Sequence, residues 1–472
     1  MNTSAAAPLV DIGPSAAQRL AAGRALRERV PRSSHSAWTA PKDRADPLAI
    51  LAGTCNGRVS ALVPLRNAKM AESPFAFFRG GADIMAADLA RTPATGLPVQ
   101  LCGDAHCLNF GAFATAERRL IFDVTDFDET APGPWEWDLK RLAVSLVLAA
   151  RSIKLKEANA TIAVIAAARS YRLRMLEFAA ATALDIWYAR IDAASVVLDA
   201  NPDSRRHLRQ IADSANAHSM RAALEKITVT AGAIRRFRDE PPLLFHPAGD
   251  AGSEFAIEGL LESYAEHLAP EVRVLFDRYH LVDHAVKVAG VGSIGTRCSV
   301  ALMQADIDDA LILQIKQASA SVLERFTEPS AFANHGERVV RGQRLMQRAS
   351  DALLGWGTSG THDFYVRQFS DKKGALNIAA LDGFGLREYA HMCGWTLARA
   401  HARSGDAAQI AGYLGKADTF DKALVRFAVL YADQVEQDYA SFHAAADAGK
   451  IPLPPRASAE PPSPGVRSSS VR

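Results

Sequence analysis

The sequence predicts an α+β protein with two lobes, a small β-rich lobe and a large, mainly helical lobe. The small lobe is predicted from residues 286–318, where strand, glycine-rich loop, strand, turn and strand follow one another. The large lobe is predicted from an apolar helix that starts near Asp138 and from the Ala-rich residues 155–240. Helical periodicity over residues 386–402 and 423–442 adds to the large lobe near the end of the chain.

Composition excludes several classes of protein. Of 472 residues, 49% are hydrophobic and 22% charged, which is typical of a soluble globular protein. The net charge of +2 gives no reason to expect a nucleic-acid partner. No apolar run approaches the roughly 20 residues that span a membrane, and the N-terminus lacks the features of a signal peptide. We therefore expect a cytoplasmic protein with no membrane partner.

The five cysteines do not form the pattern of a disulfide framework. Cys102 and Cys107 flank a polar loop, but no second pair of cysteines completes a zinc site. Both are predicted to be small buried residues.

Five segments are expected along the chain. Residues 1–60 form an N-terminal extension, 61–280 the helical lobe, 281–375 the small β lobe, 376–450 the last helices of the large lobe, and 451–472 a disordered tail. The tail is predicted from its Pro and Ser content.

The N-terminal part contains an aromatic cluster, Pro74–Gly80 within MAESPFAFFRG. A packed aromatic loop is the favoured interpretation. The alternative is that Arg79, or Arg66 together with Lys69, binds a phosphate group.

A polar loop and an acidic cluster carry the strongest functional signal. Asp104 is followed five residues later by Asn109, then by the short apolar strand 118–122, and then by Asp126 and Asp128. In phosphoryl transfer one Asp orients or deprotonates the acceptor, an Asn holds a metal ion, and a later Asp holds the metal that bridges the phosphates. The alternative is a polar loop whose Asp and Asn side chains cap turns.

A glycine-rich loop is the second signal. Gly290, Gly292 and Gly295 form GxGxxG, but a strand follows them, whereas a dinucleotide-binding unit needs a helix there. The third strand ends at Lys316, and a nucleotide-binding sheet of the kinase type has this layout. The alternative for Lys316 is an edge-strand lysine that prevents aggregation.

A lysine in this position needs an acidic partner. Glu324 and Glu337 are the candidates on the following helical stretch, and Glu337 lies nearer the usual spacing. Asp138 has two interpretations of its own: it caps the helix that it begins, or it accepts hydrogen bonds from a neighbouring loop.

Taken together, these stretches resemble a bacterial family known as domain of unknown function 2252, over most of residues 30–440. The stretches that carry the resemblance are MAESPFAFFRG, LCGDAHCLNFG, DFDE, WEWDLKRL, KVAGVGSIGTR and FYVRQFSDKKG.

More distantly, GDAHCLN is similar to the catalytic loop of aminoglycoside-phosphotransferase-like kinases, DFDE to their metal-binding segment, and WDLKRLA to the helix after it. The resemblance implies a protein-kinase-like fold with Asp104 as the catalytic Asp and His106 beside it. It implies Mg²⁺ ligands at Asn109 and Asp126, with Asp128 as a further candidate. The residues it implies for ATP binding are Gly290, Gly292, Ser293, Gly295 and Lys316.

The order of these parts differs from that of kinases. The glycine loop and Lys316 follow the catalytic-type loop, and the helix ending at His401, which resembles the one that leads into the catalytic loop, lies near the C-terminus. A circular permutation gives this order. The expected function is ATP- and Mg²⁺-dependent phosphoryl transfer to an unknown small-molecule or protein acceptor.

Three alternatives remain open from the sequence. One is nucleotidyl transfer on the same fold, and another is a nucleotide-binding regulatory protein without catalysis. The third is a metal-dependent hydrolase that gathers His106, Asp104, Asp123 and Asp126 around a metal and leaves Lys316 far away.

Overall fold

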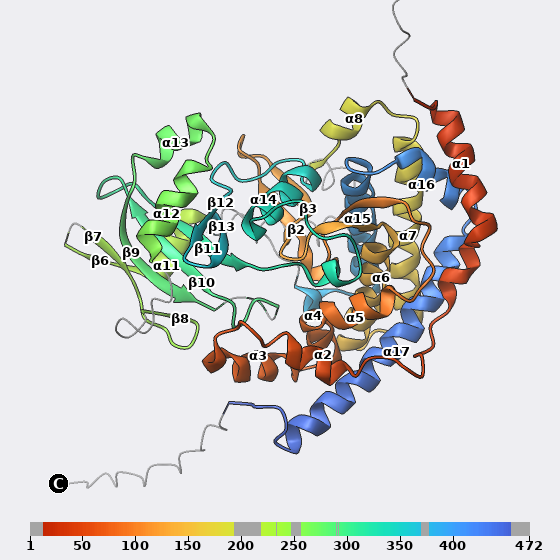
Figure 1. Ribbon diagram of the computed structural model, residues 1–472, viewed down its shortest axis with the longest axis horizontal. Helices are drawn as coiled ribbons and strands as arrows, with labels where there is room; N and C mark the ends of the chain where they lie inside the picture. Colours follow the sequence, from red (N-terminus) through yellow and green to blue (C-terminus); the bar gives the residue numbers. More distant parts are fainter. Residues whose placement is uncertain are drawn as a thin grey trace, which may run out of the picture.

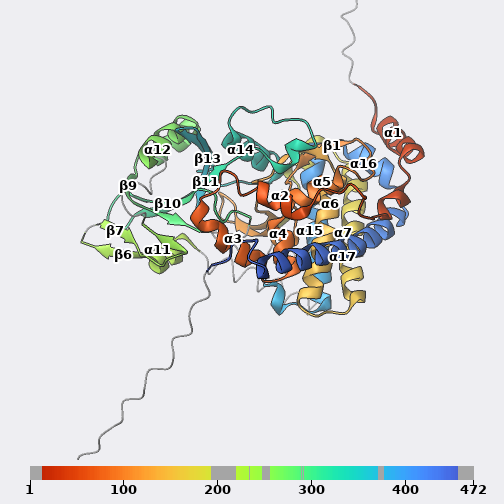
Figure 2. The same cartoon turned by 60° about the horizontal axis from the view of Figure 1, so that its bottom comes forward.

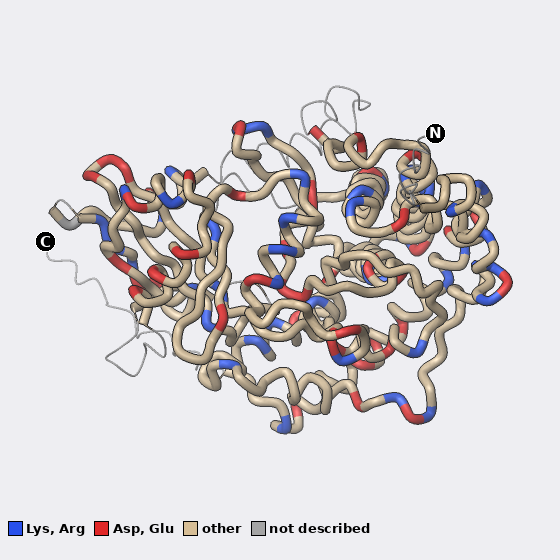
Figure 3. Tube along the Cα trace, turned by 45° about the horizontal axis from the view of Figure 1, so that its top comes forward, with Lys and Arg blue, Asp and Glu red and all other residues tan. Residues whose placement is uncertain are grey.

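A computed structural model describes residues 13–192, 219–232, 234–246, 256–288, 290, 292–369 and 377–454. The fold is α+β, with a sheet lobe and a larger helical lobe side by side (Figure 1). Acidic and basic residues are interspersed over both lobes (Figure 3). Within the described ranges, no helix has the length and apolar character needed to cross a membrane.

The sheet lobe is built on one antiparallel six-stranded sheet with the strand order β12-β13-β11-β10-β9-β8. Its strands are β8 (Leu244–Phe245), β9 (His280–Lys287), β10 (Cys298–Gln304), β11 (Ala310–Ala318), β12 (Gly355–Ser359) and β13 (His362–Gln368). The predicted succession of strand, glycine loop, strand, turn and strand is therefore present as β9, β10 and β11.

Both faces of this sheet are covered. Successive side chains of a strand point to opposite faces, so a strand whose residues are all buried must be covered on both sides. Alternate residues of β10 such as Ala301 and Met303 pack against α12 (Ile257–Glu266) and α13 (Pro270–Phe276). Their neighbours Val300 and Leu302 pack against α11 (Met220–Ile227) and against Phe237 of β7 (Ile234–Phe237), which pairs with β6 (Thr228–Ala231).

Two sequence expectations for this region need correction. Residues 228–237 form the hairpin of β6 (Thr228–Ala231) and β7 (Ile234–Phe237), not a helix. Helices α11, α12 and α13 pack on the sheet, so the sheet lobe begins well before residue 281. The apolar face of each short helix is buried against the nearest strands, and sequence periodicity does not say which lobe supplies that partner.

The helical lobe surrounds α6, which is buried over nearly its whole length. Its long helices are α6 (Glu136–Ser152), α7 (Glu157–Phe178), α15 (Gly383–Ala402) and α17 (Thr419–Asp447), with the shorter α8 (Ala183–Tyr188) and α16 (Ala407–Leu414) beside them. Helix α15 lies along α7, and α1 (Ala16–Arg29) packs on α16. Helix α1 and the short helical turn Arg32–Ser36, which pack on α16 and α17, are therefore part of this lobe rather than an extension from it.

Three short helices lie between the lobes in both views (Figures 1 and 2). They are α2 (Pro47–Gly53), α3 (Val63–Met70) and α4 (Pro74–Gly80), and α5 (Ala82–Leu89) follows them. Asp46 caps α2 by accepting a hydrogen bond from the Leu48 amide at 3.0 Å. The aromatic cluster is thus the helix α4 rather than a loop, and its N-cap is Ser73, whose Oγ accepts from the Ala76 amide.

Small strands complete the join between the lobes. β1 (Pro98–Leu101) pairs with β4 (Ala131–Pro134), and β2 (Phe110–Ala114) pairs with β3 (Leu120–Val124), which also pairs with β5 (Ile191–Asp192). Nearly all of the expected tail lies outside the described residues.

His35 gives the helical lobe a titratable group within its core. It is fully buried, its Nε2 lies 2.8 Å from the Tyr413 hydroxyl, and its ring contacts Phe420 edge-on. Burial, with a smaller contribution from the charge of Lys140, lowers the pKa of His35 to about 3.

We expect His35 to make stability fall on acidification. Between about pH 6.5 and 3 the unfolded chain binds a proton that the folded protein does not, so the free energy of unfolding rises with pH in that window. His35→Gln, which keeps a polar partner for Tyr413, should reduce this slope by up to ~1.4 kcal/mol per pH unit. Urea unfolding at several pH values from 4 to 7 measures it, and an unchanged slope would contradict the assignment.

Candidate active site

Asp138 holds the polar loop between β1 and β2 in place by accepting hydrogen bonds from its backbone amides. Its Oδ2 accepts a hydrogen bond from the Cys102 amide at 2.8 Å, and its Oδ1 accepts one from the Gly103 amide at 3.1 Å. His401 at the end of α15 lies 3.3 Å from the same carboxylate. Of the two interpretations of Asp138, the structure therefore selects the acceptor for a neighbouring loop.

Gly103 is required where this loop passes the acidic cluster. Its φ is +84°, and a Cβ there would lie 2.1 Å from the Glu129 carbonyl oxygen. Only glycine allows both the conformation and this close approach. The contact brings the loop of Asp104 against the segment that carries Asp126 and Asp128.

Asp104 faces a cavity and is held by a cation. The Arg141 Nε donates a hydrogen bond to Asp104 Oδ1 at 2.5 Å, and His106 Nε2 lies 3.7 Å from Asp104 Oδ2. Burial lowers the pKa of His106 to about 4, so His106 is neutral at neutral pH. A neutral imidazole at this distance serves as a polar neighbour of Asp104 rather than as its ion-pair partner.

Asn109 and Asp126 line the same cavity, and both carry side-chain oxygens of the kind that Mg²⁺ prefers. Asn109 donates from Nδ2 to the Asp104 carbonyl at 2.8 Å, which leaves its Oδ1 as an available ligand. Burial and then the charge of Asp128 raise the pKa of Asp126, and a cation would relieve that penalty. The described residues contain no group of three His, Cys, Asp or Glu with metal-site geometry. Mg²⁺ commonly takes one or two protein oxygens and completes its shell with water and phosphate.

Asp128 is occupied by partners from the sheet lobe. Its Oδ2 accepts from Lys316 Nζ at 2.5 Å and from Ser293 Oγ at 3.2 Å, and its Oδ1 accepts from the Tyr365 hydroxyl at 2.6 Å. Burial alone would raise the pKa of Asp128, but Lys316 and Tyr365 outweigh it and lower the pKa to about 2. Asp128, expected as a metal ligand, thus uses both carboxylate oxygens on protein groups.

Lys316 therefore contacts the acidic cluster through Asp128, which lies 188 residues earlier in the sequence. It is 4% exposed and reaches Asp128 from β11. The expected partner Glu337 is instead paired with Arg341 at 3.2 Å on the surface of α14 (His335–Met346), and Glu324 lies 3.6 Å from Arg338. Glu337 cannot be the partner of Lys316 because the first turn of α14 directs Arg338, not Glu337, toward the acidic cluster. Arg338 donates to the Asp128 and Thr130 carbonyls.

The glycine loop joins β9 to β10 above this cluster. Gly290 and Gly295 have φ values of +57° and +91°, which favour glycine. Arg58 fastens the loop by donating to the Gly292 and Ile294 carbonyls at 3.0 and 2.6 Å. Gly290, Gly292 and Ser293 line the cavity, while Gly295 lies against the Arg58 side chain.

The candidate site is thus one cavity of about 110 Å³ between the lobes. It joins Asp104, His106, Asn109, Asp126 and Asp128 with the glycine loop and with three arginines of the N-terminal segment, Arg58, Arg66 and Arg79. A neighbouring cavity of about 230 Å³ shares Arg58, Asp128 and Ser293 with it and extends along residues 317–320.

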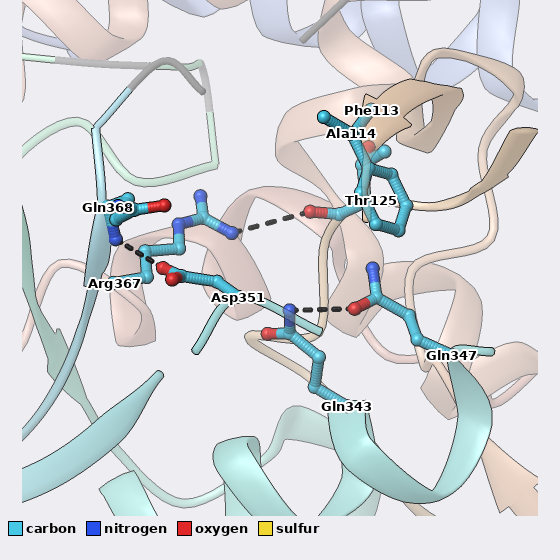
Figure 4. Close-up of a pocket in the computed structure, with 8 residues that line it drawn as sticks. All are labelled: Phe113, Ala114, Thr125, Gln343, Gln347, Asp351, Arg367 and Gln368. Atoms are coloured by element: carbon cyan, nitrogen blue, oxygen red, sulfur yellow. Dashed lines mark hydrogen bonds between the residues drawn. The ribbon is translucent and has the colours of Figure 1, made fainter. Parts of the chain in front are cut away.

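A third cavity lies between α14 and β13 and is smaller, about 40 Å³. Figure 4 shows that polar groups around it are paired: the Gln343 side chain donates to Gln347 at 2.9 Å, and Arg367 donates to the Thr125 backbone carbonyl at 3.4 Å. With room for only a few waters, it is a polar junction rather than a substrate site.

The geometry disfavours the hydrolase alternative. That alternative needs Asp123 beside Asp126 on a metal and Lys316 far away. Asp123 is buried and paired with Arg399, and Lys316 is on Asp128. Asp123 is therefore a structural acid that ties β3 to α15.

Sequence reasoning missed Arg58, Arg141 and Tyr365. Arg141 had a detectable signal, since it follows Asp138 by one turn on a helix that is otherwise apolar nearly all round. Arg58 and Tyr365 had none, because their partners lie far away in sequence. Lys69, named with Arg66 as a candidate phosphate ligand, is exposed and paired with Glu72 at 2.6 Å.

Comparison with known proteins places the chain in a family. The profile of the family described as "uncharacterized protein conserved in bacteria (DUF2252)" matches residues 58–445. Neither the curated proteins nor the solved structures contain a match to the chain. The matched range begins at Arg58 and includes all the residues of the cavity except Thr54, together with Lys316. The chain therefore belongs to the DUF2252 family of bacterial proteins.

Proposed function

We propose that this protein is a kinase-like phosphotransferase that transfers the γ-phosphoryl group of ATP, with Mg²⁺, to a hydroxyl of its acceptor. The observation that carries the proposal is the cavity that joins Asp104, Asn109 and Asp126 under the glycine loop, with Lys316 on Asp128. These are the groups that phosphoryl transfer uses to position the acceptor, the metal and the phosphates.

Each group has a role that its geometry supports. The glycine loop presents backbone N–H groups to phosphate oxygens, and Lys316 neutralises them from the third strand. Asp128 holds Lys316 ready, as an acidic partner does in kinases. Mg²⁺, when bound by Asn109 and Asp126, would neutralise charge on the phosphates. Asp104, fixed by Arg141, accepts the proton of the acceptor hydroxyl.

The strand order also favours a permuted kinase-like fold. The loop joins the neighbouring strands β9 and β10, and the lysine lies on the next strand, β11. The end of α15 abuts the start of the polar loop: Ser404 Oγ accepts from the Gln100 amide at 2.9 Å across 304 residues. A chain rejoined at that contact would run from α15 into β1 and the Asp104 loop, which is the unpermuted order.

Thermal unfolding tests nucleotide binding. We expect ATP with Mg²⁺ to raise the melting temperature, because a ligand that binds the folded state stabilises it, by about 2.7 kcal/mol at 100 times Kd. ATP with EDTA and Mg²⁺ alone serve as controls and should have little effect. An unchanged melting temperature at millimolar ATP and Mg²⁺ would contradict the proposal.

A further inference from the structure

Two arginines of the N-terminal segment line the cavity with unused hydrogen-bond donors. Arg66, on α3, is 1% exposed and donates from Nη2 to the Gly80 carbonyl at 2.8 Å. By hydrogen-bond geometry its Nε and Nη1, and the Nε of Arg79, have no partner among the described residues, and the thiol of Cys55 is close enough to interact with Arg66. A buried guanidinium with free N–H groups is costly unless an acceptor arrives.

These two arginines also lack a carboxylate. Among the described residues, Lys316, Arg141 and Arg338 each have an acidic side chain within 4.0 Å, whereas Arg66 and Arg79 have none. Arg58, the third arginine of the cavity, also has none in that part of the chain, but it donates to the Gly292 and Ile294 carbonyls. Burial, then the neighbouring Arg58, lowers the pKa of Arg66 to about 10, so it stays charged at neutral pH. Asp83 is near enough to raise that pKa but forms no ion pair with Arg66.

Arg79 lies beside Asp104, because Arg141 donates both to Asp104 and to the carbonyl of Phe78. Arg66 is next to Arg79 in the structure through its hydrogen bond to the Gly80 carbonyl. Burial lowers the pKa of Arg79, and the charge that opposes this most is that of Asp104. Lys316, by contrast, is tied to Asp128 and feels Asp126. Lys316, bound to Asp128 at the cavity wall, is thus the cation proposed to meet the nucleotide phosphates, whereas Arg66 and Arg79 form a separate cationic pair in the cavity beside Asp104.

We propose that Arg66 and Arg79 bind an anionic group, phosphate or carboxylate, on the acceptor itself, so that the acceptor is a small anionic alcohol. The reaction described next rests on the proposed phosphotransferase function. The acceptor hydroxyl gives its proton to Asp104, its oxygen forms a bond to the γ-phosphorus, and the bond from that phosphorus to the bridging oxygen breaks. ADP leaves with the electron pair, and the acceptor keeps its original anionic group on the two arginines.

Arg79→Gln is the informative variant. Arg79 is half-buried and lies over the Phe75 ring at 5.9 Å, so its loss leaves no buried carboxylate unpaired. Arg66→Lys is the second variant and keeps a charge for the fold. Lys69→Gln is the matched control, because Lys69 lies one turn from Arg66 on the same helix but is exposed and paired with Glu72.

Calorimetric titration with inorganic phosphate and with succinate, each with and without Mg²⁺ and a non-hydrolysable ATP analogue, tests the inference. We expect at least one of the two anions to bind the wild-type protein also when the analogue is present. Arg79→Gln and Arg66→Lys should each weaken that anion by about 10- to 100-fold, the range for a charged hydrogen bond. Affinity for the nucleotide analogue should change less than about threefold, and Lys69→Gln should change neither affinity.

Three results would overturn the inference: wild-type affinity for the anion in Arg79→Gln, no binding of either anion, or a parallel loss of nucleotide affinity, which would make these arginines nucleotide ligands. Binding of phosphate alone supports a phosphorylated acceptor, and binding of succinate supports a carboxylate. Failure of the phosphotransfer proposal is seen separately. In that case Arg79-dependent anion binding persists although ATP with Mg²⁺ neither binds nor stabilises the protein.

Discussion

Replacing Asp126 by alanine is expected to abolish Mg²⁺-dependent nucleotide binding while leaving the fold intact. Asp126 is half-buried beside the negative Asp128, and its one hydrogen bond within the described residues is from the Asp128 amide at 3.2 Å. Burial and Asp128 raise its pKa, so its carboxylate is held at a cost that a cation offsets. Removing it therefore costs the fold little and removes the charged ligand that the ion would use.

The measurement compares calorimetric affinity for ATP with Mg²⁺ against affinity for ATP with EDTA, in Asp126→Ala and in wild type. We expect the difference between the two conditions to disappear in the variant, a loss of at least about tenfold. Asp277→Ala, at an exposed acid paired with Arg273 on the sheet lobe, is the control for charge. A variant with undiminished Mg²⁺ dependence would move the metal to Asp128 and require Lys316 to release it.

Asp104→Asn is expected to reduce turnover by roughly 10²–10⁴ while nucleotide affinity changes little. Asparagine keeps an oxygen that can accept the hydrogen bond from Arg141 Nε, so the geometry of the loop is preserved. What disappears is the base that we propose takes the acceptor proton, and such a base acts in the transition state rather than in nucleotide binding. Turnover and affinity are measured on the same preparation, with ATP hydrolysis or autophosphorylation as the readout until an acceptor is known.

His106→Gln is the companion variant. Because burial keeps His106 neutral, its replacement by another neutral polar residue should lower turnover far less than Asp104→Asn does. A wild-type protein that binds ATP tightly but turns over no faster than Asp104→Asn, with any pool of acceptors, would support a regulatory nucleotide-binding protein instead.

Local sequence was enough to predict the two halves of the candidate site. Residues 98–134 form the short strands β1 to β4 around the Asp104 loop, so Asp104, Asn109 and Asp126 are close in sequence and line one cavity. The glycine loop likewise joins β9 to β10, and Lys316 lies on the next strand of the same antiparallel sheet, β11. Both halves depend on short-range chain geometry, which residue spacing encodes.

Secondary structure was predicted correctly for long segments with a strong helical period and incorrectly for some short segments. The long helices α6, α15 and α17 appear where they were expected, because each buries a continuous apolar surface. The segment of α4 was misassigned because a Pro-bounded run of seven residues has too few turns to show a period. The β6–β7 hairpin lay within a stretch of strong helical composition, and packing on the sheet decided it.

The sequence by itself determined the chemistry of the candidate site: an Asp, an Asn and an acidic cluster at fixed spacing, and a glycine loop followed by a lysine. Only the tertiary structure decided which groups meet. It placed Lys316 on Asp128 rather than on Glu337, fixed the Asp104 loop through Asp138, and brought Arg66 and Arg79 to the cavity wall. Such contacts join segments up to about two hundred residues apart, and burial of whole helix faces selects them, which no local spacing specifies.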